Sequence, residues 1–107
     1  MAPQSVPINV YETTGALVVI APLPAVQASD VTIELRPGML RFWAHLRSAP
    51  PREHLVHEWH YGPYERSLTI PEGYNGEAKA SFGNGQLAVH LGRGAADAGG
   101  GSKVIKP

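Results

Sequence analysis

The dipeptide Asn84-Gly85, with its two flanks, constrains the fold more than any other stretch of this chain. Both residues accept the positive φ angles that a two-residue turn between antiparallel strands requires. On either side of the dipeptide the apolar residues step by two, which is the period of a strand with one buried face. The stepping residues are Ala78, Ala80 and Phe82 before the turn, and Leu87, Val89 and Leu91 after it. The sequence therefore predicts a β-hairpin over residues 78–91.

Similar but shorter patterns occur along most of the chain. Val31, Ile33 and Leu35 alternate with polar residues and are followed by the turn signal Pro37-Gly38. Residues 16–21 are apolar throughout and rich in β-branched side chains, which is typical of a strand with both faces covered. Further strands are predicted at residues 8–12, 40–44, 55–61 and 64–70. Because these seven or eight short strands are accompanied by no helical pattern, the predicted fold is an all-β antiparallel β-sandwich.

The remaining segments divide the chain. Residues 1–7 are predicted to be a short flexible leader, and residues 8–91 a single domain. We interpret the long connection 47–63 as a protruding loop that carries the strand at 55–61. Glycine and alanine predominate after the last strand, so residues 92–107 are predicted to be a flexible C-terminal extension.

Composition limits the classes of partner. The chain has nine basic and nine acidic side chains, so it favours neither nucleic acid nor an anionic membrane. It contains no cysteine, which excludes disulfides and thiolate chemistry and fits a reducing compartment. The N-terminus does not resemble a signal peptide, and no apolar run is long enough to cross a bilayer. We therefore expect a cytoplasmic protein.

The histidines and serines provide little support for a metal site or an enzyme. His54, His57 and His60 would share one face of a helix and could then bind zinc or copper. On the strand predicted here, however, His57 and His60 point to opposite faces, so we expect no metal and no cofactor. A milder alternative is that their protonation weakens an interface that contains them. No serine has the context of a catalytic nucleophile, and the sequence predicts a protein that is not an enzyme.

Three large side chains indicate contacts beyond the core of one subunit. Trp43 neighbours another aromatic residue in an alternating strand, so one of the two faces away from the core. Trp59 lies in the protruding loop, where we expect an intermolecular contact. Arg66 occupies an inward position and needs an acidic partner if it is buried, for which Glu58 and Glu65 are candidates.

The C-terminal segment Lys103–Pro107 has a small apolar centre, Val104-Ile105, between two lysines. Two interpretations stay open for it. It either docks as an extra edge strand in an apolar groove of a neighbouring subunit, or it is a disordered tail.

Four motifs, in order along the chain, resemble the α-crystallin domain of the small heat shock proteins. Ala80-x-x-x-Asn84-Gly85-x-Leu87 resembles the A-x-x-x-n-G-x-L signature of that family. The others are Leu23-Pro24-Ala25-Val26 with Asp30-Val31, which resembles L-P-G-v…e-D-I; Pro37-Gly38-Met39-Leu40, which resembles the second G-x-L turn; and residues 61–71, which resemble Y-G-x-F-x-R-x-F-x-L-P. The resemblance covers about residues 7–91. Ala25 replaces the usual glycine, and Val104 and Ile105 are adjacent where the family's I-x-I/V anchor separates two apolar residues by one.

The resemblance implies an immunoglobulin-like sandwich that acts as an ATP-independent holdase, binding partly unfolded client proteins and preventing their aggregation. It also implies a homodimer of the bacterial, archaeal and plant type, in which the loop strand of one subunit pairs with the first strand of the other. Because the leader is shorter than the family's N-terminal arm, we expect a dimer or small assembly. The expected dimer-interface residues are Ile8, Val10, Tyr11, Leu55, His57, Trp59, Tyr61 and Arg66.

We place a groove for clients or for the tail between the strands at 31–35 and 78–82. Its expected lining residues are Val31, Ile33, Leu35, Ala78, Ala80 and Phe82, and the expected C-terminal anchor is Val104 with Ile105. The alternative is a non-catalytic interaction module, such as a p23-like co-chaperone, which shares the architecture and is expected to be a monomer.

Overall fold

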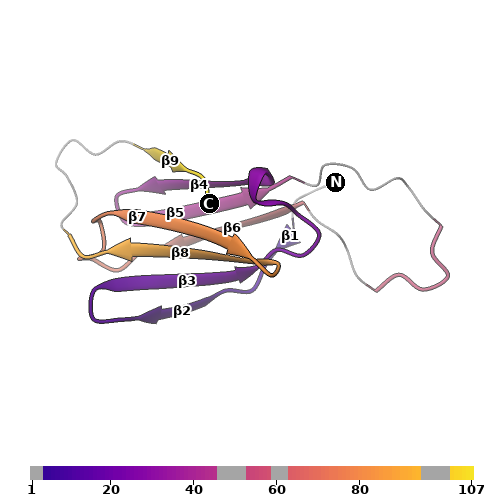
Figure 1. Cartoon of the computed structure of the whole chain (residues 1–107), viewed down its shortest axis with the longest axis horizontal. Helices are drawn as coiled ribbons and strands as arrows, with labels where there is room; N and C mark the ends of the chain where they lie inside the picture. Colours follow the sequence, from indigo (N-terminus) through magenta and orange to yellow (C-terminus); the bar gives the residue numbers. More distant parts are fainter. Residues whose placement is uncertain (1–3, 46–52, 59–62, 95–101) are drawn as a thin grey trace.

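The computed structural model of the chain describes residues 4–45, 53–58, 63–94 and 102–107. These residues form two packed β-sheets and one 3-10 turn, η1 (Ala28–Asp30), so the predicted all-β sandwich is confirmed (Figure 1). Sheet A has the order β1-β6-β5-β4-β9, and sheet B has the order β2-β3-β8-β7. The strands are β1 (Gln4–Ser5), β2 (Asn9–Glu12), β3 (Ala16–Pro22), β4 (Val31–Arg36), β5 (Met39–Ala44), β6 (Tyr64–Thr69), β7 (Ala78–Gly83), β8 (Gln86–Gly92) and β9 (Lys103–Ile105).

The core lies between the inward faces of the two sheets, as the alternating patterns predict. Phe42 is fully buried at the centre of β5, next to Ile33 of β4. From sheet B, Val19 and Val89 pair across β3 and β8 and are equally buried. The buried core residues are Val6, Leu17, Val19, Ala21, Leu23, Val31, Ile33, Leu40, Phe42, Ala44, Tyr64, Ile70, Tyr74, Leu87, Val89 and Leu91.

The predicted hairpin between β7 and β8 has the expected turn. Asn84 and Gly85 have φ angles of 52° and 73°, both positive, as a turn matching the twist of the strands requires. The Gly85 carbonyl accepts a hydrogen bond of 2.8 Å from the Leu23 N–H, so the turn is also tied to the chain that follows β3.

The leader is not uniformly flexible, contrary to the sequence prediction. Gln4 and Ser5 form β1, which pairs in parallel with Tyr64 and Glu65 at the start of β6. Val6 is only 4% exposed and belongs to the core. The apolar Val6 side chain therefore anchors a segment that its local composition marks as irregular.

The extension also begins later than predicted, because Gly92 ends β8 and residues 92–94 are fixed to the loop before β7. Asn75 N–H donates to the Gly94 carbonyl and Gly76 N–H to the Gly92 carbonyl, both at 3.0 Å. A Cβ atom on Gly76 would overlap the Arg93 carbonyl oxygen. Glycine here permits two backbone segments to lie in close contact, whereas the glycine-rich composition alone predicts a flexible segment.

The strand predicted at 55–61 is not formed in residues 55–58, which are the part of it that the structure describes. Residues 53–58 contain a bend at 55–56 but no strand, and they lie well away from both sheets (Figure 1). Residues 59–61 lie outside the described residues. A strand needs a neighbouring strand to satisfy its backbone groups, and the described part of this chain brings none alongside residues 53–58. Leu55 and Val56 are 104% and 74% exposed.

Ala25 has a φ angle of 69°, in the left-handed region where a Cβ atom is unfavourable. This explains why the resembling motif has glycine there. We expect Ala25→Gly to raise the free energy of unfolding by about 0.5–1 kcal/mol, because relief of the Cβ strain exceeds the added entropy of the unfolded chain. Ala28→Gly, in η1, is the control and should lower stability. Equal effects of the two changes in chemical denaturation would contradict this account.

Candidate functional site

The edges of the sandwich are where another polypeptide segment can add to a sheet. In sheet B the edge strands are β2 and β7, and in sheet A β4 lies second from the edge, beside β9. The predicted groove residues divide into two groups. Val31 and Ile33 are fully buried core residues, whereas Leu35, Ala78, Ala80 and Phe82 are partly buried and pack against the core from its margin.

The tail strand β9 lies antiparallel along β4 of the same chain (Figure 1). Its register places Ile105 opposite Ile33 and Val104 opposite Glu34. Because neighbouring residues of a strand point to opposite faces, Ile105 turns inward and packs against the core, while Val104 is 58% exposed. The tail therefore adds one strand to sheet A by backbone pairing, with one apolar side chain directed at the core.

The last two residues extend this contact. The Lys106 ammonium group donates to the Ser29 carbonyl at 3.3 Å and to the Thr32 hydroxyl at 3.2 Å. Pro107 is half-buried, like Ile105, whereas Val104 and Lys106 are exposed. The two half-buried apolar residues of the tail are thus Ile105 and Pro107, which are separated by one residue, and not the adjacent pair Val104 and Ile105. That spacing is visible in the sequence, although apolar character alone favours the adjacent pair Val104-Ile105.

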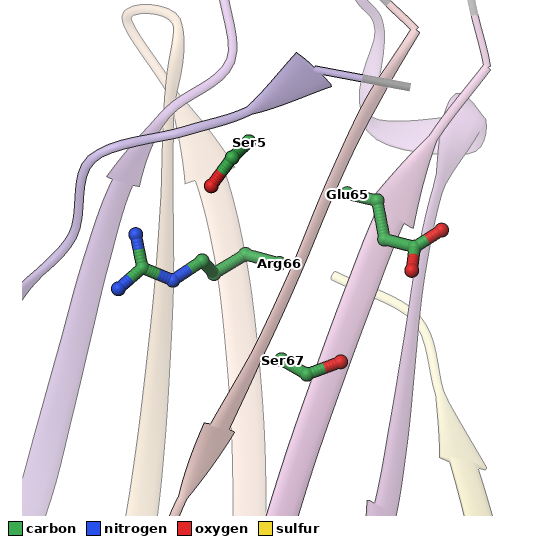
Figure 2. Close-up of a pocket in the computed structure, with 4 residues that line it drawn as sticks. All are labelled: Ser5, Glu65, Arg66 and Ser67. Carbon is green, nitrogen blue, oxygen red and sulfur yellow. The ribbon is translucent and has the colours of Figure 1, made fainter. Parts of the chain in front are cut away.

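Arg66, on β6, contacts the leader. It is half-buried, and its Nη1 donates a hydrogen bond of 2.7 Å to the Val6 carbonyl. Within the described residues this carbonyl, and not a carboxylate, is its hydrogen-bond partner. Glu65, one of the two candidate partners, does not pair with Arg66, because consecutive strand residues point to opposite faces and Glu65 lies on the other side of β6 (Figure 2). An open hollow of about 350 Å³ beside Arg66 is lined by Ser5, Glu65, Arg66 and Ser67.

Glu65 instead pairs with Arg41 on the outer face of sheet A. The Arg41 guanidinium donates to both Glu65 carboxylate oxygens, at 3.1 and 3.4 Å, and lies 4.4 Å from the centroid of the Trp43 ring. The hydrogen bond to Glu65 raises the pKa of Arg41 above its ordinary value. Trp43 is thus the outward-facing aromatic residue of its strand, half-covered by Arg41, while its neighbour Phe42 fills the core.

The family model described as the Hsp20/alpha crystallin family matches residues 9–106 of this chain. The chain belongs to the Hsp20/alpha crystallin family. This membership supports a chaperone-type role, and the members of the family are non-enzymatic chaperones. No curated protein matches the chain significantly.

Solved structures of small heat shock proteins confirm the sandwich. Heat shock protein 16.0 from Schizosaccharomyces pombe aligns with a TM-score of 0.75 and 24% identity, over 91% of this chain and 72% of that one. The hspA protein from Xanthomonas axonopodis gives 0.78 and 22%, over 89% and 100% of the two chains. A small heat-shock protein from Xylella fastidiosa gives 0.70 and 20%, over 90% and 92%.

In this Hsp20 family member the predicted dimer-interface residues do not meet within one chain. Val10 and Tyr11 are 45% and 51% exposed on β2, whose second edge has no partner strand among the described residues. Ile8 precedes β2 and is partly packed against the core. Leu55 and His57 belong to the loop segment 53–58, which lies away from β2 (Figure 1). Trp59 and Tyr61 lie outside the described residues.

The described histidines form no metal site. The rings of His54 and His57 stack with their centroids 4.4 Å apart, and His60 lies outside the described residues. In the part of the chain that the structure describes, no group of three or more metal-ligating side chains comes together. The same part contains no helix long and apolar enough to cross a membrane.

Proposed function

We propose that this Hsp20 family member is an ATP-independent holdase that binds extended segments of partly unfolded proteins and limits their aggregation. The observation that supports this most directly is the docking of β9 on β4. The chain's own tail occupies the site as an unfolded segment would, in extended conformation and through backbone hydrogen bonds.

The same geometry accounts for binding that is broad and reversible. Backbone pairing does not depend on the client's side chains, because each residue carries the same donor and acceptor. The one inward position, filled here by the partly buried Ile105, selects an apolar side chain, whose burial contributes about 1–2 kcal/mol. A contact of this size is released without ATP, and a client must compete with the tail for the β4 edge.

The expected homodimer by loop exchange is part of the proposal. The open edge of β2 has exposed apolar side chains, and the described loop residues include the fully exposed Leu55. Pairing of the loop of one subunit with β2 of the other would give the β2 edge a partner strand and would cover the exposed Leu55 side chain. Trp59 and Tyr61 belong to the same proposed interface. A cytoplasmic location is also proposed, in agreement with the absence of cysteine.

Light scattering from a heated client protein tests the holdase function. We expect the full chain to suppress client aggregation in the absence of ATP. Unchanged scattering at several-fold molar excess of the chain over client would contradict the proposal. Mass determination during size-exclusion chromatography separates it from the co-chaperone alternative, which is expected to be a monomer.

Leu55→Asp tests the loop exchange. We expect the dimer dissociation constant to rise at least about tenfold, because a charge would replace an apolar side chain at the interface. Met39→Asp is the matched control, since Met39 is 44% exposed on the outer face of sheet A, away from the loop and β2. Sedimentation analysis that finds the two variants equally dimeric would exclude Leu55 from the interface.

A further inference from the structure

The chain has three asparagines, Asn9, Asn75 and Asn84, and the last two are each followed by glycine. An asparagine in this context can react with its own backbone. The nitrogen of the next residue attacks the side-chain carbonyl carbon, a new C–N bond forms, and the side-chain nitrogen leaves as ammonia. Water then opens the resulting succinimide to aspartate or isoaspartate, with no oxidant or reductant involved. Glycine hinders this attack least because it has no side chain.

The fold holds Asn75-Gly76 in a conformation that disfavours this reaction. The attacking nitrogen would be that of Gly76, and its N–H is engaged by the Gly92 carbonyl at 3.0 Å. The Asn75 N–H is bonded to the Gly94 carbonyl at the same distance. The Gly76 backbone is also pressed against residues 92–94, where even a Cβ atom would not fit. We call residues 73–77 with 92–94 the glycine clamp.

Asn84-Gly85 has the opposite surroundings. Asn84 is exposed at the tip of the β7–β8 turn, and no heavy atom outside residues 84–86 lies within 4 Å of the point where a Gly85 Cβ would be. Among the described residues the Gly85 N–H has no hydrogen-bond acceptor, whereas the Gly85 carbonyl is bonded by Leu23 N–H. The turn can therefore flex into the reactive geometry at the cost of at most one hydrogen bond, without opening the β7–β8 ladder.

From this contrast we propose that Asn84 is the site of spontaneous deamidation in the folded protein, and that the glycine clamp protects Asn75. Isoaspartate at Asn84 inserts an extra carbon into the backbone of a turn whose two residues already need positive φ angles. It displaces the Gly85 carbonyl from Leu23 and loosens β7, an edge strand of the sandwich.

Peptide mapping by mass spectrometry of the full chain, aged at mildly alkaline pH, tests the proposal. We expect Asn84 to convert at least about tenfold faster than Asn75, since several clamp contacts must open before Asn75 can react. In denaturant the fold no longer distinguishes the two Asn-Gly sites, so the two conversion rates should become similar. Equal rates in the folded chain, faster conversion of Asn75, or no conversion at Asn84 would each overturn the assignment.

Two comparisons separate the backbone change from the added charge. Aged chains that contain isoaspartate at this position should melt at a lower temperature than fresh chains. Asn84→Asp introduces the same charge with a normal backbone and should lower the melting temperature less. If Asn84→Asp and the aged chains melt alike, displacement of the turn backbone is not the cause.

Discussion

Replacing Arg66 with glycine is expected to free the leader from the sandwich and to lower the free energy of unfolding by about 2–3 kcal/mol. The guanidinium donates to the Val6 carbonyl at 2.7 Å, a charge-assisted bond to a backbone group that fixes β1 beside β6. Its loss also weakens the hold on the Val6 side chain, which is 4% exposed. Chemical denaturation gives the stability change, and faster proteolysis within residues 4–7 reports release of the leader.

Arg41→Gly is the matched control for this prediction. Arg41 also lies in sheet A and makes two charged hydrogen bonds, but its side chain is 37% exposed. A solvent-exposed pair of this kind contributes little to stability, so Arg41→Gly should lower the free energy of unfolding less than Arg66→Gly does. Arg66→Gly should in addition promote aggregation, because release of β1 leaves the start of β6 as an unpaired sheet edge. Equal losses of stability in the two variants, with the leader still protected from protease, would refute the role assigned to Arg66.

The second large effect is expected at the tail, where Ile105→Asn should release β9 from β4. The inward Ile105 side chain is partly buried and contributes about 1–2 kcal/mol, so its loss shifts the balance between docked and free tail by about five- to thirtyfold. Hydrogen exchange of the β4 backbone amides measures the release directly. Under the proposed function, the same variant should suppress client aggregation more strongly, because the edge is open.

Val104→Asn is the control, since Val104 is the neighbouring apolar residue but faces solvent. Asparagine is preferred to aspartate in both variants because position 104 pairs opposite Glu34, where a second negative charge would itself weaken the strand. We expect the β4 amides of Val104→Asn to exchange as in the unaltered chain. If the two variants exchange alike, the inward position is not the one that holds the tail.

The sequence predicted best what depends on local patterns. Alternation identified β4 and both strands of the last hairpin, and Asn84-Gly85 identified its turn. These features need only information within a few residues, because side-chain period and turn conformation are local properties.

What the sequence could not predict depends on partners distant in the chain. The acceptor for Arg66 is a backbone carbonyl, which every residue has and no residue type marks. For residues 92–94 of the glycine clamp, composition predicts a flexible extension, because glycine serves both flexibility and close backbone approach. For the predicted strand at 55–61, no described segment of the same chain supplies a partner strand, so one chain cannot test it.

The docking of β9 on its own chain has a consequence for how the protein responds to its surroundings. A contact within one molecule has an occupancy that does not change on dilution, whereas a contact between two molecules is lost as the concentration falls. Under the proposed loop exchange, lowering the amount of protein should therefore dissociate the subunits while every tail stays in place. Heating, by contrast, opens both contacts. The contact between subunits would therefore respond to protein concentration and to temperature, whereas the docked tail would respond to temperature alone.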